Sequence, residues 1–581
     1  MESDNQTREL RLKGSSTILS YLTRFSATEK VVFGIFAAAL IVTALVMALR
    51  ANSYFMSEIP AHGGSLHEGL VGLPHTVNPV LAVTDVDRDI ASLVYAGLTR
   101  NQGGKIVADL AEKWDVSPDG MTYTFTLKPN LEFHNGASLT ADDVVFTINK
   151  IKDSSLKSPR AIDWAGVSVQ ASGPSTVVFT LKQPMSTFLS NATVGILPKS
   201  IWGNVSDEQF IFSGYNVRPV GAGPYKVGTI TSDQGGIPTD YELDSWSDYA
   251  GTEAHISDIT FTFFPDLDHA LTALSNGSID SLSSIPPSAA AKLAANKGEP
   301  YTIDTAALSR IFGVFLNQNK NQALTDTAIR QALSLTVDRS QIIKEVLAGY
   351  GIPVNGPVSV SAPAGSSTSD VPAALALLSK NGWKLSPNGV LEKKPAKKGQ
   401  ASTTISFTLY TPDTADLMQV ANILKTQWAK IGISVNVISL PPADLYQNVI
   451  RVRGYDALLF GQIVSKPTDL YAFWHSSQRL APGVNVSMYT NSKADRLLDT
   501  IRTATSTDAS TSAYGQFIQT ITDDIPAIFL YSPDLIYAVP KTLRGIGLTT
   551  ATSPSDRFQN VTSWYTETQR VWNIFIKKVQ Y

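Results

Sequence analysis

Residues 91–150 read ASLVYAGLTRNQGGKIVADLAEKWDVSPDGMTYTFTLKPNLEFHNGASLTADDVVFTINK. A Ser-x-Asp-Gly pattern begins at Ser117, and this pattern is typical of a tight turn that leads into a strand. Residues 121–128 (MTYTFTLK) then alternate between apolar and polar side chains. This alternation predicts a strand that carries Tyr123 and Phe125 on one face.

Outward from this stretch, the chain shows both helical and strand patterns. The clearest helix pattern covers residues 413–432, where an apolar stripe ends at Gly432, a residue suited to a left-handed C-terminal cap. A second helix is predicted over residues 326–348, with an aspartate as its cap. Short alternating strands are predicted at residues 177–181 and 405–409. This mixture, with frequent Gly, Pro, Asn and Asp turns, predicts an α/β protein.

The composition narrows the class of protein. The chain has 581 residues, which is too long for one ordinary core and predicts two or three packed lobes. Its formal net charge of −3 argues against a nucleic-acid binder with a broad basic face. Because the chain has no cysteine, disulfides, thiolate metal sites, cysteine catalysis and an anchor through an acylated cysteine are all excluded.

One apolar run, residues 31–49 (VVFGIFAAALIVTALVMAL), has no charged residue and no proline. A helix of this length rises by about 28 Å, which is enough to cross the hydrocarbon layer of a membrane. Basic residues are frequent before the run, and only Arg50 follows it closely. The positive-inside rule therefore places the tail, residues 1–30, in the cytoplasm and the rest of the chain outside. We expect an uncleaved single-pass transmembrane anchor, then a short linker over residues 50–64.

A cleaved signal peptide is the alternative interpretation, because Ala51 and Ser53 form a small-x-small pair. The segment before the apolar run and the run itself are both long for a signal peptide. A buried core helix is disfavoured because the run has no polar face to present to water.

Ordered motifs extend from residues 91–150 through most of the chain. They closely resemble those of family 5 bacterial extracellular solute-binding proteins, the group that contains dipeptide-, oligopeptide- and nickel-binding proteins. The early motifs are Tyr95-x-Gly97-Leu98-Thr99, Leu110-Ala111-Glu112-x-Trp114, Phe133-His134-x-Gly136 and Leu139-Thr140-Ala141-x-Asp143. The later ones are Pro219-Val220-Gly221-Ala222-Gly223-Pro224-Tyr225, Phe264-Pro265-Asp266, Ile329-Arg330-Gln331-Ala332-Leu333 and Phe473-Trp474-His475-Ser476-Ser477. The likeness covers about residues 69–498, and its strength lies in the ordered set.

The resemblance implies a fold. It implies a two-lobed periplasmic-binding-protein-like architecture of the class II, cluster C type, with hinge strands between the lobes and an extra subdomain in the first. On this basis we expect lobe I at residues 65–105, 217–298 and 530–581, the extra subdomain at 106–216, and lobe II at 299–529.

The resemblance also implies a function. The chain would capture a solute, expected to be a peptide, between the lobes and deliver it to an ABC importer, whose permease subunits and ATPase would be its partners. Closure of the lobes on the ligand would be the signal that the permease recognises. The binding domain would be extracytoplasmic, monomeric and without a cofactor. A ligand-sensing receptor ectodomain, or a binder of an oligosaccharide or nickel complex, are the alternatives.

Catalytic motifs are missing from the sequence. It contains no His-Glu-x-x-His, no Walker loop and no Gly-x-Ser-x-Gly elbow. Its seven histidines show no metal-ligand spacing, so neither a catalytic nor a metal site is expected. For His134, packing or a hydrogen bond within a turn is the expected role.

One segment departs from the family's peptide-binding members. There, as the resemblance implies, a Tyr-Asp strand is followed by roughly Gly-Trp-x-x-Asp, whose carboxylate pairs with the free amino group of the peptide. Here Gly461 is followed by Gln462 at the tryptophan position and by Ser465 at the carboxylate position. A buried ammonium without a partner is costly. Either Asp469 replaces the carboxylate, or the ligand presents no free amine there, and Asp469 is equally suited to cap the next helix.

We expect backbone groups and Gln462 to line the cleft, and simple zwitterionic dipeptides to bind poorly. The predicted ligand-binding residues are Gly461, Gln462, Ile463, Ser465, Asp469 and His475.

Overall fold

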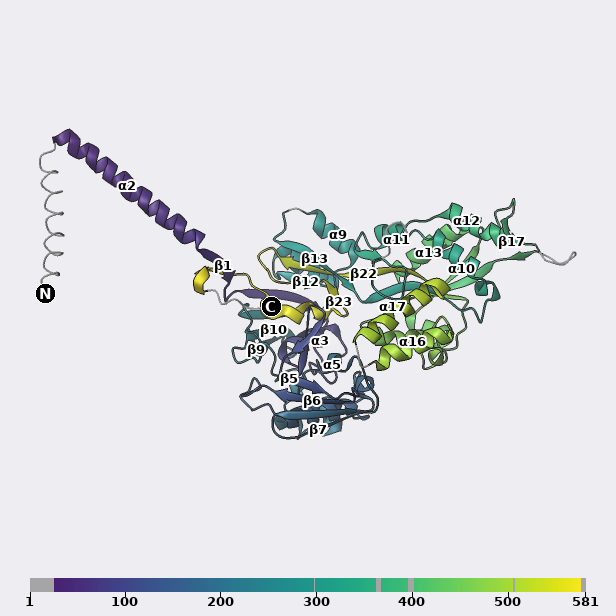
Figure 1. The fold of residues 1–581 in the computed structure, drawn as a ribbon, viewed down its shortest axis with the longest axis horizontal. Helices are drawn as coiled ribbons and strands as arrows, with labels where there is room; N and C mark the ends of the chain where they lie inside the picture. The colour runs from purple at the N-terminus through teal and green to yellow at the C-terminus, as the bar shows by residue number, and fades with distance from the viewer. Residues whose placement is uncertain (1–25, 297, 362–366, 395–401, 505–506, 576–581) are drawn as a thin grey trace. The chain divides into compact units, whose positions relative to one another are not determined.

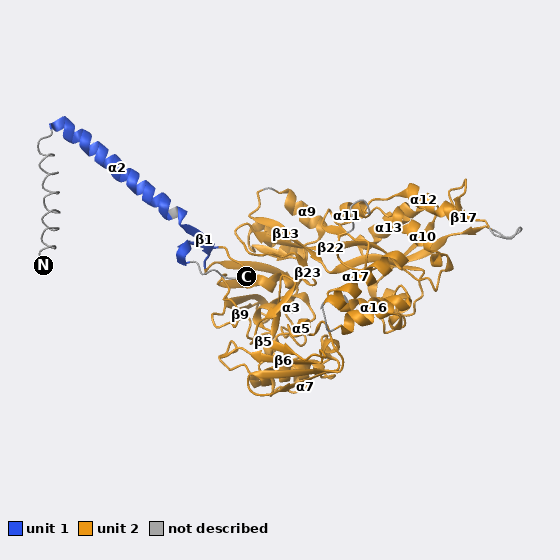
Figure 2. Cartoon of the chain, viewed as in Figure 1, with its two compact units in different colours: residues 1–61, 567–581 blue, residues 62–566 orange. Residues whose placement is uncertain are grey.

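The structure is a computed structural model, and it describes residues 26–296, 298–361, 367–394, 402–504 and 507–575. It divides into two compact units, coloured separately in Figure 2. Unit 1 comprises residues 1–61 and 567–581, and unit 2 comprises residues 62–566. Most of the predicted cytoplasmic tail lies outside the described residues.

Unit 1 contains helix α2 (Ala27–Tyr54) and one pair of strands. Ser26 caps the helix, since its hydroxyl accepts from the backbone N–H of Glu29 and the Glu29 carboxylate accepts from the backbone N–H of Ser26. The apolar side chains of the helix are exposed along its length, and its apolar part, Ala27–Asn52, is long enough to cross a membrane. The segment expected as a linker holds the end of α2 and strand β1 (Met56–Pro60), which pairs antiparallel with β24 (Thr568–Trp572).

Unit 2 is built on one mixed sheet, which begins at β20 and ends at β9. Its parallel pairs include β19 with β20 and β2 with β11, whereas β14, β21 and β22 pair antiparallel. The described strands follow the order β20 (Ser434–Leu440), β19 (Ser406–Pro412), β21 (Ala457–Ile463), β14 (Arg310–Leu316), β22 (Ala527–Pro540), β12 (Ser281–Ser283), β2 (Ser65–Val71), β11 (Asp258–Phe264), β10 (Pro238–Ser245) and β9 (Tyr225–Ser232).

Strand β22 connects two separate cores. Its first half pairs with β14, and its second half pairs with β13 (Tyr301–Leu308). Figure 1 shows β22 between the region of β12 and β13 and the region of α10 and α13. We call the part around β2 and β9–β11 lobe I, and the part around β14 and β19–β21 lobe II. Only Ser309 separates β13 from β14, and both pair with β22. The continuous segment β13–β14 and the strand β22 therefore form two adjacent connections between the lobes.

Lobe I includes a smaller antiparallel sheet with the order β5 (Ala111–Val116), β6 (Thr122–Leu127), β8 (Thr176–Leu181) and β7 (Val167–Ala171). Strand β6 confirms the predicted strand at residues 121–128, and β8 confirms the one at 177–181. Tyr123 and Phe125 are buried, as the alternating pattern predicts, and they pack with Phe188. These strands lie together in Figure 1.

Lobe II confirms one predicted helix and corrects another. Helix α13 (Ala415–Ala429) lies within the predicted range, and Gly432 after it has a left-handed φ of 76°. The single helix predicted over residues 326–348 is wrong, because the chain forms α10 (Thr327–Thr336) and α11 (Arg339–Val346). Asp338 adopts an extended backbone between them, and its carboxylate accepts from the N–H of Gln341 to cap α11.

Candidate ligand-binding site

Two adjoining cavities lie between the lobes of unit 2. The larger has a volume of about 490 Å³ and is lined by α3 (Asp85–Val94), β3 (Thr99–Gln102), η7 (Pro554–Ser563) and, from lobe II, Ile463. The smaller has a volume of about 290 Å³ and adds Ser309, Ser465 and neighbouring residues. Since they share lining residues, including Asn101 and Gln559, we treat them as one cleft. A cleft of this size fits a small solute or part of a peptide.

Lobe I contributes three arginines to the larger cavity, Arg88, Arg100 and Arg160. Arg88 makes one exposed ion pair with Asp85, at 3.5 Å between Nη1 and Oδ1. Within the described part of the chain, the guanidinium groups of Arg100 and Arg160 make no hydrogen bond or ion pair. Guanidinium groups of this kind are suited to bidentate binding of carboxylates.

The acidic residues that line the same cavity are already engaged. Asp109 is 4% exposed and accepts a hydrogen bond of 2.7 Å from the hydroxyl of Tyr249, and burial raises the pKa of its carboxyl. Asp556 accepts from the backbone N–H groups of Thr552 and Ser553 at the start of η7. Both carboxylates therefore already accept hydrogen bonds from neighbouring groups of the protein.

A buried ionic network fixes the position of η7 in lobe I. Arg557 is fully buried beneath the cleft, and its guanidinium donates to Glu68 of β2 at 2.8 Å and to Asp89 of α3 at 2.7 and 3.0 Å. The hydroxyl of Tyr537 also donates to Glu68, at 2.8 Å. Three elements of lobe I are thus joined below the surface that lines the cavity.

The turn formed by Gly221, Ala222, Gly223 and Pro224 maintains the fold beside the cavity. A Cβ at Gly221 would lie 2.0 Å from the carbonyl oxygen of Val94, so only glycine allows this close approach. His134 holds the turn, with Nε2 at 3.0 Å from the carbonyl oxygen of Gly223 and Nδ1 at 3.4 Å from the N–H of Gly221. Burial lowers the pKa of His134 to about 4, so the ring is neutral at pH 7.

Tyr95 is a buried aromatic residue that lines the larger cavity. It is 5% exposed, and its hydroxyl has no hydrogen-bond partner among the described residues. A buried hydroxyl without a partner is costly, and this oxygen is closed off from solvent in the structure.

Of the predicted ligand-binding residues at the end of β21, some line the cleft and others are buried in the strand. Ile463 is 44% exposed and lines the larger cavity, and Ser465 is exposed and lines the smaller one. Gln462 is only 5% exposed in β21, and Gly461 lies where a Cβ would approach the ring of Phe312 to 2.9 Å. Gln462 and Gly461 are therefore packed within the strand and do not lie on the surface of the cleft.

Asp469 stands at the N-cap of α15 (Leu470–Trp474), but its carboxylate does not cap that helix. It turns back and accepts from the backbone N–H groups of Ser465 and Lys466, at 2.9 and 3.0 Å. Burial raises the pKa of this carboxyl, and the hydrogen bond from Lys466 opposes the shift. These two hydrogen bonds make Asp469 a structural part of the loop that carries Ser465.

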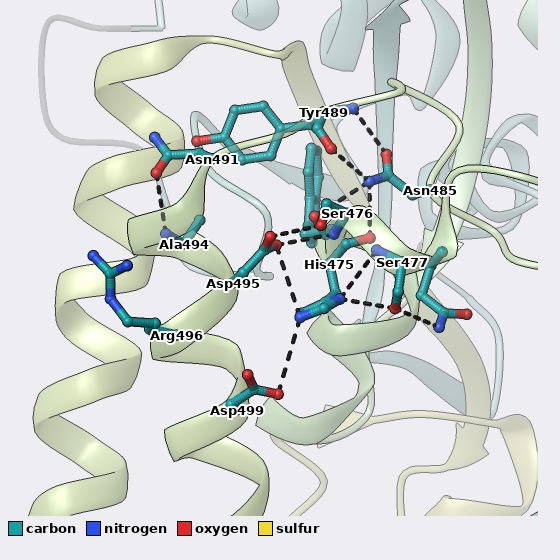
Figure 3. A network of polar contacts seen from close by, with 12 residues as sticks. His475, Ser476, Ser477, Asn485, Tyr489, Asn491, Ala494, Asp495, Arg496 and Asp499 are labelled. Carbon is teal, nitrogen blue, oxygen red and sulfur yellow. Dashed lines mark hydrogen bonds and ion pairs between the residues drawn. The ribbon is translucent and has the colours of Figure 1, made fainter.

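His475 lies in a polar network with helix α16 (Ser492–Thr503), shown in Figure 3. Its ring stacks on Tyr471, Nδ1 lies 2.8 Å from the hydroxyl of Ser477, and Nε2 lies 3.9 Å from both Asp495 and Asp499. These contacts tie α15 to α16 and give His475 a structural setting, apart from the segment that contains Ile463 and Ser465.

The lobes also touch away from the hinge strands. Lys466 of lobe II reaches lobe I, where Nζ lies 2.9 Å from the amide oxygen of Asn191 and 3.9 Å from the carboxylate of Asp163. The hydroxyl of Ser186 donates to the carbonyl oxygen of Ile501, at 3.0 Å. A further contact lies within the hinge itself, where the hydroxyl of Ser532 donates to the carbonyl oxygen of Leu308, at 2.6 Å.

The side chains of lobe I that line the cleft were not predicted from the sequence. Arg100 directly follows the Tyr-x-Gly-Leu-Thr motif, and a charged residue next to such an apolar run was the available signal. No comparable signal marks Arg160 or Tyr249. No cluster of His, Asp and Glu side chains able to hold a metal ion occurs among the described residues.

Comparisons with known proteins agree with this architecture. The family described as bacterial extracellular solute-binding proteins, family 5 Middle, matches residues 105–480. The oligopeptide-binding protein AppA of Bacillus subtilis (strain 168) is 29% identical over 525 residues, which are 87% of this chain and 92% of AppA.

Solved structures show the same fold. The Bacillus subtilis AppA structure in complex with a nonapeptide has a TM-score of 0.62 and 27% identity, over 87% of this chain and 99% of that one. The ABC transporter substrate-binding protein CtaP from Listeria monocytogenes has a TM-score of 0.72 and 27% identity, over 87% and 100%. NikZ from Campylobacter jejuni, solved with Ni(L-His), has a TM-score of 0.65 and 26% identity, over 86% and 99%.

The family match spans more than half of the chain, and the structural likeness includes both lobes. The chain therefore belongs to the family 5 bacterial extracellular solute-binding proteins, which bind solutes for transport and are not enzymes.

Proposed function

We propose that the chain is a membrane-anchored, extracytoplasmic protein that captures a peptide between its lobes and presents it to an ABC importer. The observation that carries this proposal is the cleft, which is lined by both lobes and crossed by two hinge strands. Ligand that contacts both lobes stabilises the closed state by its preference for that state over the open one.

The ligand's carboxylate is expected to bind the arginines of lobe I. Arg100 and Arg160 line the cavity, whereas its carboxylates, Asp109 and Asp556, already accept hydrogen bonds. With Ser465 at the position of the family's carboxylate, and Asp469 bonded to its own loop, lobe II offers no free carboxylate to an amino terminus there. Peptides held mainly by their carboxylate and backbone fit this arrangement, and the similar protein AppA was solved in complex with a nonapeptide.

Retention of helix α2 is part of the proposal. The helix continues through Ala51 and Ser53 to Tyr54, so a signal-peptide cut at the small-x-small pair would fall within helical structure. Strand β1 begins two residues later and pairs with the C-terminal strand β24. The exposed apolar surface of α2 supports a helix that faces lipid.

The ligand can be identified with the native, full-length protein. We would extract it from membranes in detergent, record its native mass, and analyse the molecule released by denaturation. The proposal predicts a retained peptide and an intact N-terminus. Release of an oligosaccharide or a nickel complex would contradict the peptide assignment, and a mature N-terminus near Tyr54 would contradict the anchor.

A further inference from the structure

The C-terminal end of α2 and the last described residues of the chain meet in an exposed apolar cluster within unit 1. The side chains of this cluster are between 39% and 81% exposed. Its members, which we call the juxtamembrane cluster, are Tyr54, Phe55, Trp572, Ile574 and Phe575. The rings of Phe55 and Trp572 stack at 6.3 Å with an angle of 8°, and Tyr54 meets Phe55 edge-on at 5.4 Å.

The cluster is held by regular structure. Strands β1 and β24 pair in a continuous register from Met56 with Trp572 to Pro60 with Thr568. Beyond the register, the backbone N–H of Asn573 donates to the carbonyl oxygen of Phe55 at 2.8 Å. The hydroxyl of Ser57 donates to the side-chain oxygen of Asn573 at 2.6 Å. Figure 2 shows β1 in unit 1, beside the end of α2.

The position of the cluster along α2 indicates what covers it. The uncharged run of α2 ends at Leu49, and Tyr54 lies five residues further on, which is about 7.5 Å along the helix axis. This distance reaches from the edge of the hydrocarbon layer into the headgroup region, where tyrosine and tryptophan are enriched in membrane proteins. The next part of the strand pair is polar, since Arg570 and Glu58 form an exposed ion pair at 3.3 Å.

We propose that the juxtamembrane cluster is seated in the headgroup region of the outer leaflet, so that the C-terminal strand gives the protein a second attachment to the membrane. This inference rests on the proposed anchor, because continuity with α2 identifies lipid as the occupant. An exposed apolar patch at the end of a membrane helix loses its contact with water at this depth. Trp572 and Tyr54 would place their polar groups toward the headgroups.

The absence of cysteine from the chain makes the test direct. Single substitutions Leu40→Cys, Ile574→Cys and Ile162→Cys would each carry a nitroxide label on the full-length protein in lipid nanodiscs. The native side chains at these positions are 71%, 80% and 78% exposed, so the label adds little strain. The readout is collision of the label with oxygen, which enters lipid, and with a water-soluble nickel chelate.

We expect the Leu40 and Ile574 labels to collide with oxygen and to be shielded several-fold from the chelate relative to the Ile162 label. A label at Phe575→Cys should give the same result as the label at Ile574. This second site controls for local distortion by either label. Chelate access at Ile574 and Phe575 equal to that at Ile162, with Leu40 shielded, would overturn the inference and leave the anchor intact. Chelate access at Leu40 would instead contradict the anchor, and the inference with it.

Discussion

Lobe I presents long cationic side chains to the cleft, whereas lobe II presents a short segment of backbone from Ile463 to Lys466. The lobe I surface stands on a buried ionic network beneath η7. The lobe II segment is held by β21 and by the carboxylate of Asp469, and Lys466 crosses to the other lobe. On the proposed function, we therefore expect lobe I to supply most of the binding energy and lobe II to supply closure.

The largest effect is expected when the support of the lobe I surface is removed. Arg557→Met leaves Glu68 and Asp89 buried without a counter-charge, which should lower the free energy of unfolding by about 3–5 kcal/mol. Urea denaturation would measure it. Arg88→Met is the matched control, since its exposed ion pair with Asp85 should contribute less than about 1 kcal/mol. Equal losses in the two variants would contradict a rigid lobe I face.

A pH effect on lobe I is expected from His134. Its pKa is about 4 in the folded protein and 6.5 when unfolded, so below pH 6.5 the unfolded state takes up the proton first. The stabilisation is complete above pH 6.5 and is lost as the pH falls toward 4, by about 2–3 kcal/mol at pH 4.5. The stability gap between wild type and His134→Gln should therefore narrow between pH 7 and pH 4.5. A gap that stays constant would rule out a buried neutral ring.

Removal of the cationic groups should reduce affinity without changing stability. Charged hydrogen bonds contribute about 1.5–3 kcal/mol, so Arg100→Ala and Arg160→Ala should each weaken peptide binding by about 10- to 100-fold. Calorimetry with the peptide recovered from the native protein and with its C-terminal amide would show it. The amide should bind weakly to wild type and lose little more in the variants. If both peptides lose equally, the arginines do not bind the carboxylate.

The smallest effect is expected on the lobe II side. Asp469→Asn weakens two hydrogen bonds within a loop, which should cost about 1 kcal/mol or less of stability. Free and N-acetylated forms of the peptide should keep equal affinities, because the Asp469 carboxylate is bonded to its own loop. Simple zwitterionic dipeptides should bind poorly to both proteins. A selective loss of affinity for the free peptide would show that Asp469 binds the amino terminus.

Much of the fold could be predicted from the sequence, because periodic patterns report burial directly. The strand at residues 121–128 and the helix ending near Gly432 follow from local side chains alone. The break at Asp338 was missed because the apolar pattern continues across it, and a capping aspartate inside a helical pattern resembles an ordinary polar position.

The cleft was harder to predict for a physical reason. Ile463 and Ser465 belong to one short segment, which a family motif could indicate. Arg100, Arg160 and Tyr249 are distant in sequence and come together only when the elements of lobe I pack. The network of His475 likewise depends on α16, which lies further along the chain.

The most direct test of capture between two lobes is a distance measured across the cleft. Nitroxide labels at Phe212→Cys in lobe I and Val452→Cys in lobe II, whose native side chains are 86% and 63% exposed, would report it by double electron–electron resonance. The full-length protein would be measured after removal of its ligand and again with the recovered peptide at saturation, with binding verified by native mass. Two-lobed capture predicts a broad distribution that becomes narrower and shorter with peptide. An unchanged distribution in protein that carries the peptide would contradict it.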